Sequence, residues 1–287
     1  MVSIVIPTYK RHISLQKLLL CLEKGGSSLA STEILVVDQK PESPFKLDHL
    51  PSAIRENTRY FLIEDFTSSP RARNFGIRKS KGDIIIFCDD DILPTPGFVE
   101  RFYRYYTNKN VSGVYGRILV EKRGHLVNLS TRKEPGLIMP QVKSGFFSFR
   151  REILFKIGGF DEEYLGPALR EESDLAARII KAGGQVVYAP EITCIHVGVT
   201  QGGCHAPVHQ RERLQIQNNF RYVVKNLSFG WFIFWIPLIF WECVLTRRNA
   251  RNPRLLRQSL CDYFRYLFWA LIQRREIKKN INYLVQS

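Results

Sequence analysis

Three consecutive carboxylates, Asp89, Asp90 and Asp91, follow directly after an apolar run that ends at Cys88. Their mutual repulsion requires a counterion, and alternation along an extended segment would point Asp89 and Asp91 to the same side. Two hard oxygen ligands with open coordination positions suit Mg²⁺ or Mn²⁺ that bridges to a diphosphate. The triplet therefore predicts a divalent-metal site, and the alternative is a charged loop or helix cap.

A second acidic group, Glu171, Glu172 and Asp174, stands at the start of an amphipathic helix predicted over residues 171–182. Acidic residues are favoured in the first turn of any helix by the helix dipole. A carboxylate in that position beside a cleft is also suited to general-base catalysis, because the helix fixes its direction. The residue types alone leave both explanations open.

Two arginines, Arg71 and Arg73, stand in the first turn of a helix predicted over residues 70–79. Arginine there opposes the helix dipole, so an anionic ligand or an acidic neighbour should compensate it. A phosphate or base of a ligand is the favoured partner, and a salt bridge to the Asp89–Asp91 triplet is the alternative. His196 ends an apolar stretch, where a single histidine is more often structural than a metal ligand.

The apolar pattern indicates the elements that must position these side chains. The predicted strands cover residues 2–6, 33–38, 59–63 and 83–88, with helices over residues 13–22 and 70–79. Continuously apolar strands that alternate with helices are typical of a parallel sheet covered on both faces, with ligands bound beyond the carboxyl ends of the strands. The polar residues 8–11, 38–39 and 89–91 therefore share one edge. The absence of Gly-x-Gly-x-x-Gly and of a Gly-Lys-Ser/Thr loop argues against dinucleotide-binding and P-loop folds.

The pattern changes along the second half of the chain. Short strands are expected between residues 115 and 149, and another strand over 185–188. After about residue 204 the sequence becomes basic, aromatic-rich and helical, without strands. We therefore expect an α/β catalytic domain over residues 1–204 and a helical extension over residues 205–287.

The composition narrows the class of protein. The 287 residues are 45% hydrophobic and 24% charged, which excludes disordered, collagen-like and solenoid chains. The net charge is +15, and residues 205–287 carry +10 of it, with 14 basic and 4 acidic residues. Residues 1–204 have neither a basic stripe with interleaved aromatics nor a recognition helix, so nucleic acid is not an expected partner.

The cysteine spacing and the N-terminal residues indicate the cellular compartment in which the protein is expected. No two of the six cysteines have the Cys-x-x-Cys spacing of a zinc or redox site, which favours reduced, buried thiols. Residues 1–7 have no basic segment, and their apolar run is far shorter than a signal peptide requires. We expect the protein to begin with a strand and to be cytoplasmic.

The extension contains an apolar, aromatic stretch, residues 229–241, with thirteen residues and no charge. Even extended past Glu242 to Leu245 it is shorter than the roughly twenty residues that comfortably span a bilayer. Five arginines follow between residues 247 and 257, and a single crossing would export them. We expect an amphipathic pair of helices in the membrane interface, with arginines on anionic lipid. The alternative is that these aromatics pack on the catalytic domain or form a dimer interface.

Together these segments resemble the family 2 glycosyltransferases in order and spacing over roughly residues 2–198. The matching segments are residues 3–11, 34–38, 72–77, 82–91, 158–162, 171–175 with Arg178 and Gly183, and 188–190 with His196. Each piece alone is weak, and their combination is very specific. The resemblance implies a GT-A fold that uses a divalent metal to transfer a sugar with inversion.

The resemblance also implies roles for individual positions. Residues Pro7, Thr8, Tyr9, Arg11 and Asp38 would hold the nucleotide, and Arg73 would lie beside it. Asp89 would lie near the ribose of the nucleotide, and Asp90 would also bind the nucleotide. The implied metal ligands are Asp89, Asp91 and His196.

The catalytic base implied by the resemblance departs from the family's usual residue. Glu172 stands where the family usually has aspartate, so its carboxylate lies farther out by about one carbon–carbon bond, or Glu171 serves instead. Gln39-Lys40 replaces the family's common Asp-Gly, which leaves the nucleobase open. Glu172 would take the proton of the attacking acceptor hydroxyl while the nucleoside diphosphate leaves.

The implied partners are a nucleoside diphosphate sugar, a glycan or lipid-linked acceptor of the cell envelope, and an anionic membrane surface. The protein would lie on the inner face of the cell membrane. The alternatives are a sugar-phosphate nucleotidyltransferase and a non-enzymatic membrane- or nucleic-acid-binding protein. The first lacks the glycine-rich basic loop expected after its first strand.

Overall fold

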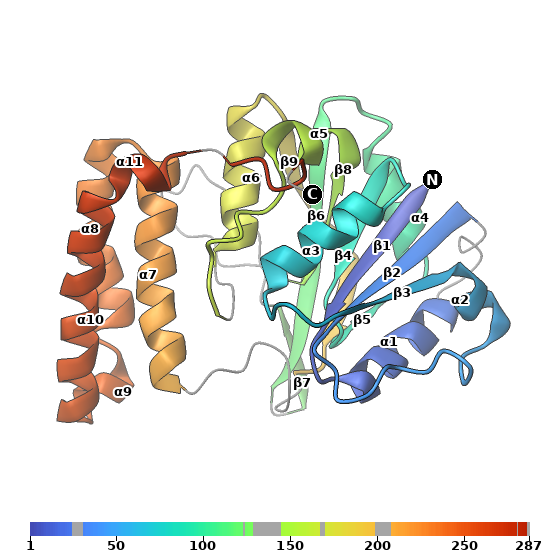
Figure 1. Ribbon diagram of the computed structural model, residues 1–287, viewed down its shortest axis with the longest axis horizontal. Helices are drawn as coiled ribbons and strands as arrows, with labels where there is room; N and C mark the ends of the chain where they lie inside the picture. The colour runs from blue at the N-terminus through green and yellow to red at the C-terminus, as the bar shows by residue number, and fades with distance from the viewer. Residues whose placement is uncertain are drawn as a thin grey trace.

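The computed structural model describes residues 1–24, 31–122, 124–128, 145–166, 170–198, 208–279 and 281–285. Within these ranges the strands form one nine-stranded mixed sheet in the order β3-β2-β1-β4-β8-β6-β9-β5, with β7 paired to β6. Helices flank the sheet, and a bundle of further helices lies to one side (Figure 1). The α/β fold class predicted from the sequence is confirmed.

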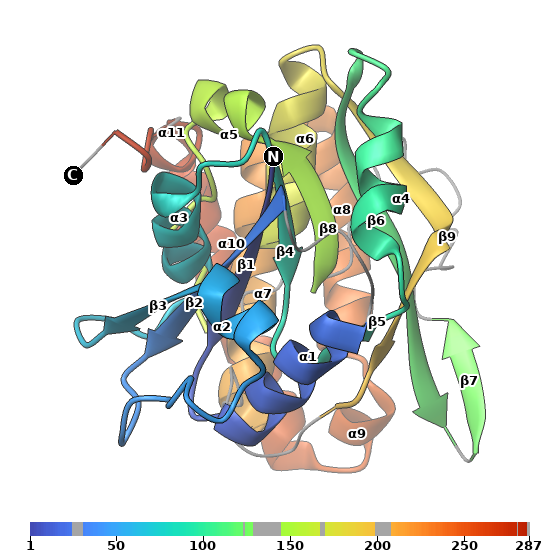
Figure 2. The same ribbon diagram turned by 90° about the vertical axis from the view of Figure 1, so that its right-hand side faces the viewer.

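The first half of the chain forms the parallel part of the sheet. Its elements are β1 (Val2–Thr8), α1 (His12–Lys24), β2 (Thr32–Gln39), α2 (Ser52–Asn57), β3 (Thr58–Ile63), α3 (Ser69–Lys79) and β4 (Ile84–Cys88). Ile4 and Ile6 of β1 pack in one core cluster with residues of α1, whereas Val5 packs in another cluster with Ile77 of α3. Because both faces are covered (Figure 2), β1 and β4 are buried at every residue rather than at alternate residues.

The second half adds antiparallel strands. Its elements are β5 (Ile92–Pro94), α4 (Phe98–Tyr105), β6 (Val111–Lys122), β7 (His125–Asn128), β8 (Phe146–Arg150), α5 (Arg151–Ile157), α6 (Glu171–Lys181) and β9 (Gln185–His196). β8 runs antiparallel to β4, and β5 runs antiparallel to β9. The register pairs Ile92 with His196, so the end of β9 lies directly beside the residues that follow β4.

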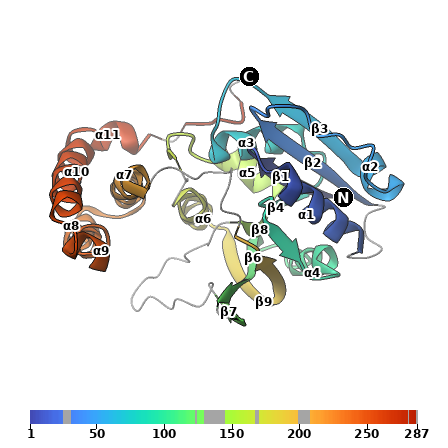
Figure 3. The same cartoon turned by 90° about the horizontal axis from the view of Figure 1, so that it is seen from below.

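The helical extension has its own apolar core. It comprises α7 (Val208–Asn226), α8 (Phe229–Cys243), α9 (Arg247–Ala250), α10 (Pro253–Ile272) and α11 (Arg274–Ile277). Figure 3 shows α7 beside α6, with α8 and α10 beyond it. None of the helices in the described part of the chain combines the length and the apolar character that a membrane crossing needs. The domain boundary expected near residue 204 falls outside the described residues.

Buried ion pairs attach the extension to the part of the chain that carries the sheet, residues 1–198, which is the expected catalytic half. Asp161 accepts hydrogen bonds from both Nε and Nη2 of Arg221, at 2.9–3.1 Å, and from Nζ of Lys225 at 2.6 Å. Asp174 of α6 binds Arg178 at 2.8 Å and lies 3.6 Å from Lys225. The cations outnumber the carboxylates at this junction.

After α11 the chain returns to the catalytic half. Tyr283 donates its backbone N–H to the carbonyl of Gly158 at 3.0 Å, and Leu284 is buried in the core cluster that contains Phe160. Gly158 and Gly159 have φ values of 82° and 75°. A Cβ on Gly159 would lie 2.9 Å from the Leu284 side chain, so both the backbone conformation and the close approach require glycine.

Candidate active site

The Asp89–Asp91 triplet lies in a turn between β4 and β5. The Ile92 amide donates to the Asp89 carbonyl at 3.2 Å, so the segment is not extended. The expectation of an extended segment at the triplet is therefore wrong. Asp90 and Asp91 instead share Nη1 of Arg11, at 3.1 and 2.8 Å, whereas Asp89 accepts from Arg73 at 2.9 Å.

Asp90 is the most enclosed carboxylate of the triplet. Thr8, the last residue of β1, donates its hydroxyl to Asp90 at 2.7 Å. Burial, with the charge of Asp91, raises the pKa of Asp90 to about 7, although Thr8 and Arg11 favour its charged form. Asp90 thus binds and releases a proton near neutral pH.

His196 is brought to the triplet by the pairing of β5 with β9. Its Nε2 lies 3.6 Å from Oδ1 of Asp91, while Arg11 binds Oδ2 of the same carboxylate. Among the described residues, no group of three or more His, Cys, Asp or Glu side chains converges on one point. Carboxylate and imidazole are both ligands that Mn²⁺ accepts, so the pair fits a metal that takes its other ligands from a diphosphate and water.

Arg73 joins the triplet to the acidic start of α6. Its side chain is only 1% exposed, and its Nη1 donates to Glu171 at 2.9 Å and to Glu172 at 3.1 Å while Nη2 binds Asp89. Burial alone would lower the pKa of Arg73, but the three carboxylates raise it, so the guanidinium stays charged. The salt bridge to the triplet, left open by the sequence, is present. Arg73 has little free surface for a nucleotide.

Glu171 and Glu172 occupy the first turn of α6 and are both buried. Burial, and next the charge of Glu172, raises the pKa of Glu171 well above its usual range. Two adjacent carboxyl groups on one arginine nitrogen cannot both lose their protons at low cost. Arg71, by contrast, pairs with Glu162 at 3.2 Å, which is the acidic neighbour its position required.

The ends of β1 and β2 form the other side of the site. Thr8 pairs with Asp38 across the two strands, next to Pro7, and Tyr9 follows, half-buried. Asp38 is fully buried, and its Oδ2 lies 2.6 Å from Nε2 of His12 and 2.7 Å from the hydroxyl of Tyr60. A cavity of about 270 Å³, lined on one side by residues 10–14 and on the other by residues 41–43, opens here.

Sequence analysis missed three of these neighbours. His12 and Tyr60 bind Asp38, and the only signal in the sequence is that each stands near the edge of a predicted element. Gly145, with φ of 109°, accepts the Asp89 amide at 2.9 Å, and a Cβ there would lie 3.0 Å from Asp89 Oδ2. The site therefore depends on a glycine beside the triplet.

A family model described as glycosyl transferase family 2 matches residues 3–161, more than half of the chain. The chain belongs to glycosyl transferase family 2. It is 27% identical over 215 residues to a pre-mycofactocin glycosyltransferase of Mycobacterium tuberculosis, a match that covers 70% of this chain and 43% of that protein. It is 25% identical to the O-antigen chain rhamnosyltransferase WbaN of Salmonella anatum, with 68% of this chain and 65% of that protein covered. The chain thus spans less than half of the length of the first of these family 2 relatives.

Solved structures show the same fold. Staphylococcus aureus TarS 1-349, in complex with UDP-GlcNAc, superposes with a TM-score of 0.65 at 14% identity, covering 99% of this chain and 89% of that one. The mannosyltransferase PcManGT of Pyrobaculum calidifontis, in complex with GDP-Man and Mn²⁺, gives a TM-score of 0.56 at 17% identity, covering 99% and 84%. The GT-A fold expected for this family 2 chain is confirmed.

Proposed function

We propose that this chain is an inverting glycosyltransferase that moves a sugar from a nucleoside diphosphate to an acceptor hydroxyl. The observation that carries the proposal is the position of Arg73, which links Asp89 after β4 to Glu171 and Glu172 on α6. A donor-binding edge and a candidate base are thereby held in one site. The fold shared with two nucleotide-sugar complexes supports this function.

The donor would lie across the carboxyl ends of β1, β2 and β4. The cavity beside His12 would take the nucleoside, with Asp89 as a hydrogen-bond acceptor, and fully buried Asp38 would position His12. Asp91 and His196 would hold a divalent metal, as Mn²⁺ accompanies GDP-Man in the archaeal mannosyltransferase. When bound there, a divalent metal would supply positive charge to offset that of the leaving diphosphate. We revise the role of Arg73 from nucleotide contact to positioning residue.

The chemical step assigns different protonation states to the two glutamates. Burial, and next the charge of Glu172, raises the pKa of Glu171, which favours its protonated form, and Glu172 would act as the base. The acceptor oxygen bonds to the anomeric carbon and its proton passes to Glu172, while the bond from that carbon to the phosphate oxygen breaks. A single displacement inverts the anomeric centre and releases a nucleoside diphosphate.

The reaction is tested by incubation with UDP-, GDP- and dTDP-sugars and detection of the free nucleoside diphosphate. Glu172→Gln should lower turnover by about a hundredfold or more while nucleotide binding persists. Exposed Glu163, changed to Gln, is the matched control and should keep full turnover. Release of pyrophosphate would identify a nucleotidyltransferase. Full activity of Glu172→Gln, with loss in Glu171→Gln, would make Glu171 the base.

The metal is tested separately by nucleotide binding. Asp91→Asn should abolish the gain in nucleoside diphosphate affinity that Mn²⁺ provides, and His196→Ala should weaken it. Undiminished turnover in EDTA would remove the metal from the proposal.

We further propose that the acceptor is an envelope glycan or a lipid-linked glycan, and that the extension docks on the cytoplasmic face of the membrane. One face of α8 and α10 packs inward, while the other leaves large apolar side chains exposed. The exposed ones are Phe229, Trp231, Ile233, Phe234, Leu238 and Trp241 of α8 and Phe264, Phe268, Leu271 and Ile272 of α10. Arg254, Arg257 and Arg265 are exposed on α10. Aromatic groups beside arginines suit an anionic membrane surface.

Membrane docking is tested by sedimentation with anionic vesicles. Phe234→Ser with Trp241→Ser should abolish sedimentation, whereas Tyr103→Ser, an exposed aromatic of α4, should not. Salt or alkaline carbonate should at least partly release the unaltered chain. Retention in the membrane pellet through alkaline carbonate would indicate a spanning hairpin. A soluble dimer that buries these aromatics would show that they bind a second copy of the chain rather than a membrane.

A further inference from the structure

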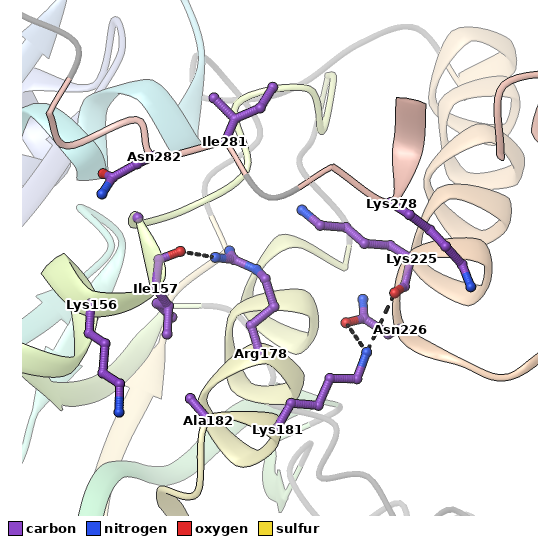
Figure 4. A pocket seen from close by; sticks show the side chains of 11 residues that line it. Lys156, Ile157, Arg178, Lys181, Ala182, Lys225, Asn226, Lys278, Ile281 and Asn282 are labelled. Carbon is purple, nitrogen blue, oxygen red and sulfur yellow. Dashed lines mark hydrogen bonds between the residues drawn. The ribbon is translucent and has the colours of Figure 1, made fainter. Parts of the chain in front are cut away.

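A second cavity, of about 450 Å³, lies where the catalytic half meets the helical extension (Figure 4). Its lining comes from α5, α6, α7 and the segment that follows α11. The charged lining residues are Lys156, Arg178, Lys181, Lys225 and Lys278. Glu171 and Glu172 begin α6, whereas Lys181 ends it, so this cavity is at the opposite end of α6 from the candidate base.

Among the described residues, the lining contains five cationic side chains and no carboxylate. Arg178 and Lys225 are compensated by Asp174 and Asp161 behind them. Lys156, Lys181 and Lys278 have no ion-pair partner within 4.0 Å in the described part of the chain. An uncompensated positive charge therefore faces the cavity.

Polar groups surround the Lys181 side chain at the cavity. Nζ of Lys181 lies 3.4 Å from both the Lys225 carbonyl and Oδ1 of Asn226. Burial lowers the pKa of Lys181, and the nearby charges of Lys278, Lys225 and Arg178 lower it further, against an opposing effect of Asp174. Arg178 donates through Nη1 to the Ile157 carbonyl at 3.0 Å, and its buried Nη2 has no partner among the described residues.

Residues from α5, α6, α7 and the segment after α11 thus place several positive charges around the same cavity. This arrangement costs free energy through mutual repulsion, and a bound anion would offset that cost. Arginine matches the paired oxygens of a phosphate, and lysines add mobile point charges around it.

We propose that this cavity binds a phosphate-bearing anion that bridges the catalytic half and the helical extension. The phosphate group has two possible sources with the same chemistry: a free phosphate or diphosphate, and the headgroup of an anionic lipid. Binding would hold α6 against α7, and it does not depend on the proposed catalytic reaction.

The test compares the unaltered full chain with two triple variants of equal charge. Lys156→Gln, Lys181→Gln and Lys278→Gln together remove the uncompensated cations. Lys17→Gln, Lys81→Gln and Lys109→Gln remove three exposed lysines elsewhere. Phosphate or pyrophosphate is titrated against sodium chloride of equal ionic strength, and Tm is measured. We expect a saturable rise in Tm for the unaltered chain and the control, and about a tenfold or greater loss of affinity in the cavity variant.

Vesicles containing phosphatidic acid or only zwitterionic lipid distinguish the two sources. If the soluble anions leave Tm unchanged, while phosphatidic acid vesicles bind the control more tightly than the cavity variant, the site takes a lipid headgroup. Equal responses of the two triple variants to both phosphate and vesicles would overturn the proposal. So would the absence of any response in the unaltered chain.

Discussion

Two charge networks meet at α6, and each contains residues of this helix. One has an excess of acidic side chains, and the other has an excess of cationic side chains. The first, the active-site network, is rich in acid and comprises Asp89, Asp90, Asp91, Glu171 and Glu172 with Arg11 and Arg73. The second, the junction network, is rich in cations and comprises Asp161 and Asp174 with Arg178, Arg221 and Lys225. One network holds the proposed catalytic groups, and the other holds the extension in place.

The difference shows how buried charges can be tuned for different tasks. In the active-site network burial, together with the charge of a neighbouring carboxylate, raises the pKa values of Asp90 and Glu171 although the arginines oppose this rise. In the junction network two cations surround Asp161 and, although burial opposes them, lower its pKa to about 2. The first network can exchange protons near neutral pH, whereas the second stays fixed in charge above acid pH.

The largest effect is expected for Arg73→Met. This change leaves Asp89, Glu171 and Glu172 without their shared cation in a buried place, so unfolding free energy should fall by about 3–5 kcal/mol. Denaturant unfolding measures the loss. Arg59→Met, which breaks a half-exposed pair with Glu33, is the control and should cost about 1 kcal/mol or less. Adding Glu171→Gln should recover part of the Arg73 loss, and equal losses for both arginines would contradict a special role of the active-site network.

Asp161→Asn should cost about 3 kcal/mol, because Arg221 and Lys225 then remain buried without their carboxylate. Since the folded pKa of Asp161 is below its unfolded value, its stabilisation is complete above about pH 4 and is lost as pH falls towards 2. Unfolding as a function of pH should show this acid slope, reduced in the variant. Exposed Asp83, changed to Asn, should leave the slope intact.

Asp90 should give the opposite pH dependence. Its folded pKa, about 7, is above the unfolded value, so stability should fall as pH rises from about 4 through 7. The slope is at most about 1.4 kcal/mol per pH unit. Asp90→Asn should flatten this slope in denaturant unfolding, and an unchanged slope would show that another group carries it.

The smallest effect is expected for Tyr283→Phe. The hydroxyl of Tyr283 donates to Asp161 at 3.1 Å, and its removal should cost about 1 kcal/mol or less. The backbone bond to Gly158 remains in this variant. A loss as large as that of Asp161→Asn would mean that the returning segment, rather than α7, holds the junction.

The parallel half of the fold was predictable because each element is encoded locally. Apolar runs such as residues 83–88 and helical spacing such as residues 13–22 need no information from elsewhere in the chain. The mixed strands are different, because the pairing of β5 with β9 joins residues about a hundred positions apart. The expected short strands between residues 115 and 149 fall partly outside the described residues.

The candidate site likewise has residues that a local sequence pattern indicates and residues that only the folded chain brings together. The triplet and the glutamates were found from residue type and spacing, and the contact of His196 with Asp91 follows the expectation from the family resemblance. The partners Arg11 and Arg73 were named, but sequence alone could not tell which carboxylates they bind. His12 and Tyr60 were missed because their common contact, Asp38, lies on a different strand. Asp161 belongs to the matching segment 158–162, but its cationic partners come from the extension and no local pattern indicates them.

The return of the chain to Gly159 has a consequence for the order in which the protein is made. Leu284 covers Gly159 and shares a core cluster with Phe160, yet the ribosome releases it more than a hundred residues later. At ordinary rates of elongation that delay is roughly ten seconds. During translation the catalytic half therefore exposes an incomplete core, and its folding can finish only after the extension has emerged. Chaperones that hold nascent chains would meet this surface first.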